Sequence, residues 1–137
     1  VNDLLLSKNC EFFINAGASS NQFLPPLFRK YSLNLEYPFN RKPIFHDLAY
    51  YLIRPYFKNN KIISYKEYFE NELFSNQDFR ILEKFDYKLQ NNSKTTLVEA
   101  SENFYKVLNN QENNFVKKTI KKGNINYYYN IYPNIPL

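Results

Sequence analysis

The chain has 137 residues and a formal net charge of +5, with 44% hydrophobic and 23% charged residues. This composition is typical of one globular domain, or part of one, and it excludes an intrinsically disordered chain. The single cysteine, Cys10, excludes an internal disulfide framework, and with His46 as the single histidine it excludes a zinc site built from these two residue types.

The sequence contains no run of about 18 apolar residues that would predict a membrane span, and no signal-peptide pattern opens it. We therefore expect a cytoplasmic protein, with peripheral contact at the inner face of the membrane allowed. The chain has no methionine and opens inside a pattern typical of a helix, so we also expect a C-terminal fragment of a longer protein.

Residues 1–57 show the alternation of a βαβ unit. DLLLSKN predicts the end of a helix, and EFFIN predicts a buried parallel strand. NQFLPPLFRK predicts a helix with both prolines near its first turn, and YSLNLEYP predicts a strand that stops at Pro38. Residues 39–57 fit either a short helix broken before Pro55 or a long loop.

Residues 58–137 form, on this interpretation, a mainly helical segment with an aromatic C-terminal tail. The capping box from Ser64 to Glu67 predicts one helix start, and a second box from Thr96 to Glu99 predicts another. The second helix would place these apolar residues on one side: Leu97, Ala100, Phe104, Val107 and Leu108. FRILEKFDYKL, between the two, fits either a helix or a strand.

The C-terminal part carries a basic run followed by tyrosines. A short helix is expected from Phe115 to Lys122, ended by Gly123. Its lysines, spaced four residues apart, would share a face that is either solvated or directed at anionic lipid headgroups or phosphates. The tail INYYYNIYPNIPL is expected to pack back on the domain, because its tyrosines would otherwise form an exposed aromatic patch.

The turn after EFFIN is the candidate binding site. A turn at the carboxyl end of a parallel strand, leading into a helix, presents unpaired backbone N–H groups and small residues that allow close approach of phosphate. The residues concerned are Gly17, Ala18, Ser19, Ser20 and Asn21. The alternative is a structural glycine turn with a serine helix cap. On the binding hypothesis, Gly17→Val removes diphosphate binding and leaves the fold largely intact.

Two further candidates stay open between chemistry and structure. His46 and Asp47 are adjacent, which suggests an acid/base pair or, alternatively, a surface or capping histidine. Cys10 opens the first strand and is interpreted as a packing residue.

Several segments resemble the C-terminal part of a family of bacterial surface or capsular polysaccharide glycosyltransferases, related in layout to the two-Rossmann-domain (GT-B) enzymes. That family has a strand C-x-F-F-I-G, a small-residue turn, an L-P-x-L-F helix and a later S-F-x-E box. The matching stretches are CEFFINAGASS, FLPPLF, NLEYPF and SYKE. The match covers residues 3–72 and, more loosely, 93–137, and Asn15 stands where the family usually has glycine.

The resemblance implies an α/β fold, the Rossmann-like half of a GT-B enzyme with a parallel sheet flanked by helices, and an incomplete one. It implies a nucleotide-sugar donor whose diphosphate lies on the amides of residues 17–21. Further donor contacts would come from Glu36, Tyr37, Pro38, Arg41, Lys42, His46 and Arg54. No metal or other cofactor is expected, because helix-dipole and basic groups stabilise the leaving diphosphate.

The resemblance also implies a saccharide or lipid-linked saccharide acceptor. The general base and the acceptor site would lie on an N-terminal domain of the same protein, so this fragment alone would be inactive. The rival interpretations are a basic, aromatic-rich module that binds nucleic acid or another anionic surface, and an inactive truncated remnant. Nucleic acid is the less favoured partner, because the basic residues are scattered over separate segments.

Overall fold

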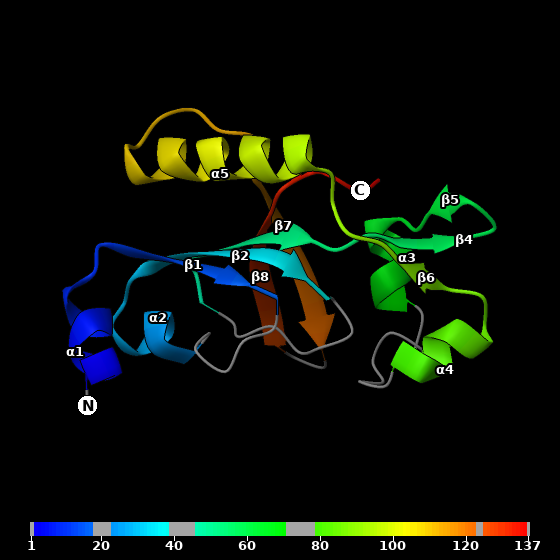
Figure 1. Ribbon diagram of the computed structural model, residues 1–137, viewed down its shortest axis with the longest axis horizontal. Coiled ribbons are helices and arrows are strands. Elements are labelled where there is room, and N and C mark those ends of the chain that lie inside the picture. The colour runs from blue at the N-terminus through cyan, green and yellow to red at the C-terminus, as the bar shows by residue number, and fades with distance from the viewer. Residues whose placement is uncertain (1, 18–22, 39–45, 71–78, 123–124, 137) are drawn as a thin grey trace.

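The computed structural model describes residues 2–17, 23–38, 46–70, 79–122 and 125–136. It is a mixed α/β structure with a mostly parallel five-stranded sheet, a small antiparallel sheet and helices on both faces of the large sheet (Figure 1). Within the described part, no helix is both long and apolar enough to cross a membrane.

The main sheet has the strand order β1-β2-β3-β8-β7. Its strands are β1 (Phe12–Ala16), β2 (Tyr31–Tyr37), β3 (Ala49–Ile53), β8 (Ile125–Ile131) and β7 (Val116–Lys122). The pairs β1–β2, β2–β3 and β3–β8 are parallel, and β7 pairs antiparallel with β8. Helix α5 (Lys94–Leu108) lies along one face of this sheet, and α1 (Asn2–Asn9) and α2 (Leu24–Leu27) lie on the other (Figure 1).

The predicted βαβ unit is confirmed. Helix α1 (Asn2–Asn9) precedes β1, and α2 (Leu24–Leu27) connects β1 to the parallel strand β2. The α2 helix is a single turn with Pro25 and Pro26 at its start, where a missing N–H costs little. The prediction that β1 is buried is wrong, since it is an edge strand and its Phe12 and Ile14 side chains are 38% and 53% exposed.

The segment before Pro55 is neither of the two alternatives expected for it. Residues 49–53 form β3, an interior strand of the main sheet, and β4 (Tyr56–Lys58) follows at once. Four of the five β3 residues are buried, because the strand is covered on both faces. Such strands are apolar without alternation, and AYYLI matches that pattern as well as it matches a helix.

A small antiparallel sheet packs beside the main one, with the order β5-β4-β6. Strand β5 (Lys61–Ile62) precedes α3 (Tyr65–Glu70), whose predicted cap is confirmed by the Glu67 amide donating to the Ser64 hydroxyl at 3.2 Å. The ambiguous segment that follows contains both structures, as α4 (Phe79–Lys84) and then β6 (Lys88–Leu89).

The long helix α5 (Lys94–Leu108) is present with the predicted buried side, since Ala100, Phe104 and Val107 are buried. Its start was predicted three residues too late. The N-cap is Ser93, whose hydroxyl accepts from the Thr96 amide at 3.1 Å. Thr96 therefore lies inside the first turn instead of capping it, because Ser93 offers the same side-chain acceptor earlier in the chain.

The helix predicted from Phe115 to Lys122 is wrong, because this stretch is strand β7 in a hairpin with β8. Lysines four residues apart satisfy a helical pattern, but strand pairing over seven consecutive residue pairs takes precedence. The prediction that the tail packs back is confirmed, since Tyr129, Ile131, Tyr132 and Ile135 are all buried.

A buried amide pair connects the first two strands of the main sheet. Asn15 and Asn34 are register partners, and the Asn15 Nδ2 donates to the Asn34 Oδ1 at 3.1 Å. The Asn34 Nδ2 in turn donates to the Tyr50 carbonyl of β3 at 3.2 Å. Asn15 and Asn34 are 8% and 3% exposed, so neither can replace its partner with bulk water. These bonds favour one register of three parallel strands.

Removing both partners of this pair is expected to cost less than the sum of the two single removals. Asn34→Ala leaves the Asn15 amide buried without its acceptor, a loss of about 1–3 kcal/mol in the free energy of unfolding. In Asn15→Ala/Asn34→Ala the loss is expected to fall short of the sum of the single losses by about 1 kcal/mol. Urea unfolding measures all four corners of the cycle, with exposed Asn91→Ala as a control expected within about 0.5 kcal/mol of the parent. If the two single losses simply add in the double variant, Asn15 and Asn34 do not stabilise the fold as a hydrogen-bonded pair.

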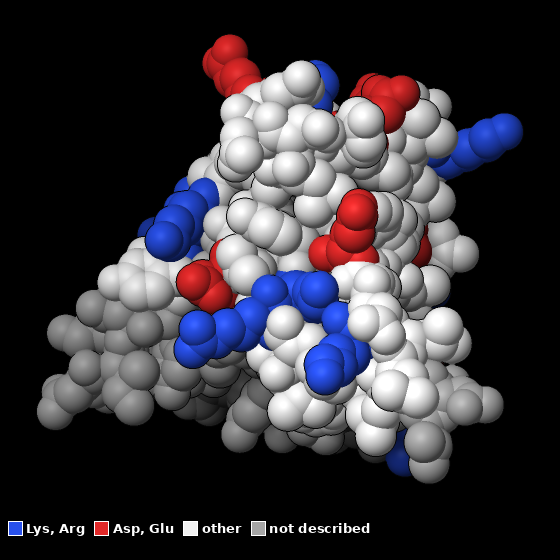
Figure 2. Space-filling view, turned by 90° about the vertical axis from the view of Figure 1, so that its left-hand side faces the viewer, with Lys and Arg blue, Asp and Glu red and all other residues white. Residues whose placement is uncertain are grey.

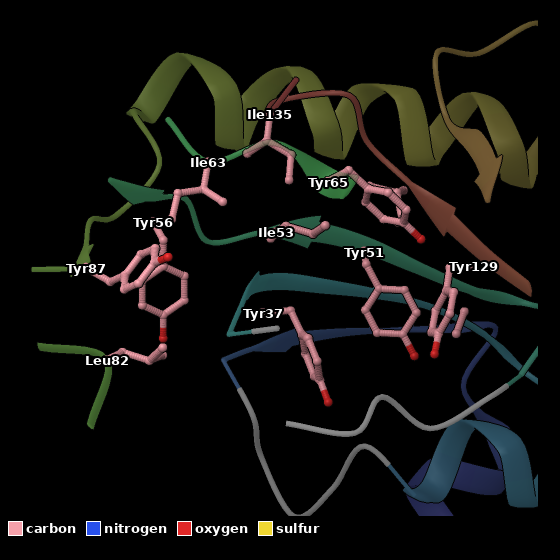
Figure 3. Packing of buried hydrophobic residues seen from close by; sticks show 12 residues of the cluster. Tyr37, Tyr51, Ile53, Tyr56, Ile63, Tyr65, Leu82, Tyr87, Tyr129 and Ile135 are labelled. Atoms are coloured by element: carbon pink, nitrogen blue, oxygen red, sulfur yellow. The ribbon is translucent and has the colours of Figure 1, made fainter. Parts of the chain in front are cut away.

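Tyrosine supplies half of the main buried cluster, which extends from the main sheet to the small sheet (Figure 3). The tyrosines are Tyr37, Tyr51, Tyr56, Tyr65, Tyr87 and Tyr129. Tyr51 packs edge-on against the Tyr37 ring, with ring centroids 5.1 Å apart, and against the Tyr129 ring at 6.2 Å. Edge-on packing is the favoured geometry for aromatic rings.

Burial of these phenols makes their ionisation unfavourable. Burial raises the pKa of Tyr56 from 10.0 to about 12, with the Arg54 guanidinium lowering it and Glu83 raising it further. Burial also raises the pKa of Tyr51 and of Tyr65. The folded chain therefore holds protons that the unfolded chain releases near pH 10.

We expect the free energy of unfolding to be fully retained below about pH 10 and to fall as the pH rises toward 12. Each such tyrosine contributes a slope of up to about 1.4 kcal/mol per pH unit, because the folded state binds the extra proton. Urea unfolding at stepped pH measures the slope. Tyr56→Phe should reduce the slope of unfolding free energy against pH, whereas Tyr105→Phe, at an exposed position, should not. Equal slopes in the parent and both variants would show that Tyr56 does not cause the pH dependence.

Candidate functional site

The carboxyl ends of β1, β2 and β3 lie at one edge of the main sheet, because these strands are parallel. Gly17 follows β1, Glu36 and Tyr37 end β2, and Arg54 follows β3. The ends of β2 and β3 are joined by the Arg54 amide, which donates to the Tyr37 carbonyl at 3.0 Å. This is the edge at which ligands of open α/β sheets bind.

Gly17 has a conformation suited to glycine, with φ +67°. A Cβ added there would meet no atom within 4 Å, so a larger residue is opposed by backbone strain and not by a clash. Its amide donates to the Leu35 carbonyl at 2.8 Å and is therefore used inside the protein. The other four residues of the predicted phosphate turn, 18–21, lie outside the described residues.

The helix after this turn offers few free amides. The α2 helix has four residues, and two of its first three positions are prolines, which have no N–H group. Its N-cap residue, Phe23, makes no side-chain cap bond. At its described positions, α2 therefore offers little of the phosphate binding that the sequence predicts for the start of this helix.

Glu36 and Arg54 are brought together at the ends of neighbouring strands. The Arg54 Nε lies 3.6 Å from the Glu36 Oε2, and the Glu36 Oε1 accepts from the Asn92 amide at 2.8 Å. Glu36 has φ +53°, and the β2–β3 register shifts between Asn34 and Tyr37. A non-glycine residue in this left-handed region is strained by about 1–3 kcal/mol, which the surrounding bonds must offset.

Two asparagines that sequence reasoning missed close this edge. The Ile53 carbonyl, at the end of β3, accepts from the Asn92 Nδ2 at 2.9 Å and from the Asn134 Nδ2 at 2.6 Å. The Asn134 Nδ2 also donates to the Asn92 Oδ1 at 2.7 Å. In the sequence Asn92 stood only in a run of polar residues and Asn134 in the tail, so no local pattern indicated that they meet.

The other described residues that the sequence predicts as donor contacts do not join the Glu36–Arg54 pair. Tyr37 is fully buried in the tyrosine cluster, so its ring belongs to the core. His46 lies before β3, at the opposite end of that strand from Arg54. Its Nδ1 accepts from the Leu48 amide at 3.2 Å, which is the capping alternative, and it lies 4.0 Å from the Asp47 carboxylate. Pro38 is partly buried, and Arg41 and Lys42 lie outside the described residues.

The described part of the chain brings no three histidine, cysteine, aspartate or glutamate side chains together as a metal site would need. The chemistry that the described residues offer at the carboxyl edge is that of one guanidinium held by one carboxylate, beside two asparagine amides. Such a group binds an anion by charge and directed hydrogen bonds.

Comparisons with protein-family models, with curated proteins and with solved structures found no match to this chain.

Replacing Asn134 is expected to loosen the carboxyl edge. Asn134→Ala removes two hydrogen bonds that the Asn134 Nδ2 donates, and it leaves the Asn92 Oδ1 without this donor. We expect a loss of about 1–3 kcal/mol in the free energy of unfolding. Hydrogen exchange should also speed up at the Arg54 amide, which lies at the same edge.

The matched control is Asn9→Ala, which removes an exposed amide that bonds only within its own helix end. It should cost less than Asn134→Ala and leave exchange at Arg54 unchanged. Equal effects of the two substitutions would show that Asn134 does not hold the edge.

Proposed function

We propose that this chain is the donor-binding part of a glycosyltransferase that builds a bacterial surface polysaccharide. The donor is a nucleotide-diphosphate sugar, and the acceptor is a saccharide or a lipid-linked saccharide. The finer fold assignment, the Rossmann-like half of a GT-B enzyme, belongs to this proposal. Its supports are the ordered motifs from CEFFINAGASS to SYKE and the parallel pairing of β1 and β2, the strands that contain FFINA and NLEY.

The Glu36–Arg54 pair carries the proposal. It stands at the carboxyl ends of two adjacent parallel strands, next to the end of β1 where the small-residue turn begins. Both side chains retain some exposure, 19% for Glu36 and 33% for Arg54, although the Glu36 Oε2 and Arg54 Nε atoms that face each other are buried. A diphosphate bound here would meet the guanidinium, while Glu36 would act as a positioning residue that limits the rotamers of Arg54.

The chemical role of such a group is to stabilise charge on the leaving nucleoside diphosphate. As the acceptor hydroxyl forms its bond to the anomeric carbon, the bond to the donor phosphate oxygen breaks and negative charge develops on that oxygen. A positioned cation is worth most at this moment because it needs no reorganisation. We assign the general base and the acceptor site to an N-terminal domain, so this chain alone is proposed to bind donor without transferring the sugar.

Calorimetric titration with uridine and guanosine diphosphate tests the proposal. We expect one of the two to bind, and to raise the unfolding midpoint in proportion to the logarithm of its concentration. Arg54→Gln should weaken that binding about tenfold, the value of one lost charge-assisted contact. Gly17→Asn, which keeps a residue type that tolerates positive φ, should weaken binding without unfolding the protein.

The matched control is Arg29→Gln, because Arg29 precedes β2 and lies at the opposite end of that strand from Glu36. It should leave diphosphate affinity unchanged. Absence of binding for both diphosphates contradicts the proposal. A single-stranded oligonucleotide that binds more tightly, with an affinity that falls steeply as salt is added, would instead favour the anionic-surface module.

A further inference from the structure

The two edges of the main sheet differ in charge. At one edge, β7 carries lysine at four of its seven positions. Lysine on an edge strand blocks the addition of another strand, because pairing would bury or crowd the charge. At the other edge, β1 reads FFINA and carries no charge at all. One edge of this sheet is protected against strand addition, and the other is open as far as the described residues are concerned.

Strand β1 has the composition of an interior strand in an edge position. Among the described strands it pairs only with β2. Its Phe12, Ile14 and Ala16 side chains share one face by alternation, and all three are exposed. Parallel strands are normally covered on both faces, so an exposed apolar run at the edge indicates that something covers it.

The direction of the free backbone groups follows from Gly17. Its amide donates to the Leu35 carbonyl, so it points toward β2. Backbone groups alternate along a strand, and those of Phe12, Ile14 and Ala16 therefore point away from β2, toward the open edge. These are the groups that a further strand would pair with.

We propose that this edge pairs with β1 of a second copy of the chain, antiparallel and centred on Ile14. In this register Ile14 faces Ile14 of the other copy, and Phe12 faces Ala16. Each large exposed side chain thus meets an apolar partner, and the largest meets the smallest, so the strand is complementary to itself. The outward backbone groups of these same residues form the hydrogen-bonded pairs of an antiparallel ladder.

The lysines of β7 explain why such pairing stops at two copies. If both edges were open, edge-to-edge addition would continue into a fibre, whereas one open edge gives a closed two-fold dimer. Further apolar surface lies beside β1, because α1 leads into it and exposes Leu4, Leu5 and Leu6. Figure 2 faces the end of the molecule where α1 and α2 lie, and shows white, uncharged surface at its lower right with Lys and Arg side chains at the margin.

Sedimentation equilibrium of the whole chain across a range of concentrations tests the dimer. The expected result is a reversible species of twice the monomer mass of 16.5 kDa. Ile14→Lys places on the open edge the residue that protects the other one, and should reduce the dimer to monomer. Val98→Lys, at a position of similar exposure on α5, is the control and should remain dimeric.

Hydrogen exchange of the parent protein gives a second test that does not depend on a variant folding. The amides of Ile14 and Ala16 should exchange more slowly as the protein concentration rises, whereas the Tyr105 amide on α5 should not change. A protein that stays monomeric at all concentrations overturns the proposal. A dimer that survives Ile14→Lys, or an assembly that grows beyond two copies, overturns it equally.

Discussion

The structure depends on the register of its parallel strands, and the buried amides of Asn15 and Asn34 hold that register. A slip of one residue would send each side chain to the opposite face and separate the two amides in an environment without water. The apolar residues of β1 and β2 could pack in more than one register, but the hydrogen bond between the Asn15 and Asn34 amides forms in one register only. Gly17 and Glu36 lie just beyond this pair, so their position at the carboxyl edge follows from it.

A second constraint joins parts of the chain that are far apart in sequence. The Ile53 carbonyl accepts from Asn92, which precedes α5, and from Asn134, in the tail. The end of the third parallel strand, β3, the segment before the long helix and the C-terminal tail therefore meet at one oxygen. Each bond contributes about 1 kcal/mol, but together they fix the path of the segment before α5 and of the tail, whose Ile135 belongs to the tyrosine cluster.

Local signals were sufficient to predict the elements whose causes are local. The Ser64 cap, the two prolines of α2 and the apolar side of α5 each act within a few residues, and each prediction held. Strand β7 was missed because its structure depends on a partner, β8, and its lysine spacing fits a helix equally well. Of the residues predicted to contact the donor, Gly17, Glu36 and Arg54 lie at one edge of the sheet, and residues 18–21 lie outside the described residues. Asn92 and Asn134 act only through tertiary contacts that no spacing predicts.

The strand order also limits where a ligand site can form. In doubly wound folds the order reverses, and the two strands at the reversal leave a crevice for the ligand. The parallel strands described here follow one another in a single direction, β1-β2-β3-β8, so no such reversal lies among them. A ligand at this carboxyl edge must be enclosed by connecting segments instead. Asn92 reaches both Glu36 and Asn134, so a charge bound at Arg54 would act through that network on the tail as well. On the proposed function, binding of the donor would therefore be coupled to the position of the C-terminal tail, because both depend on the same few polar contacts.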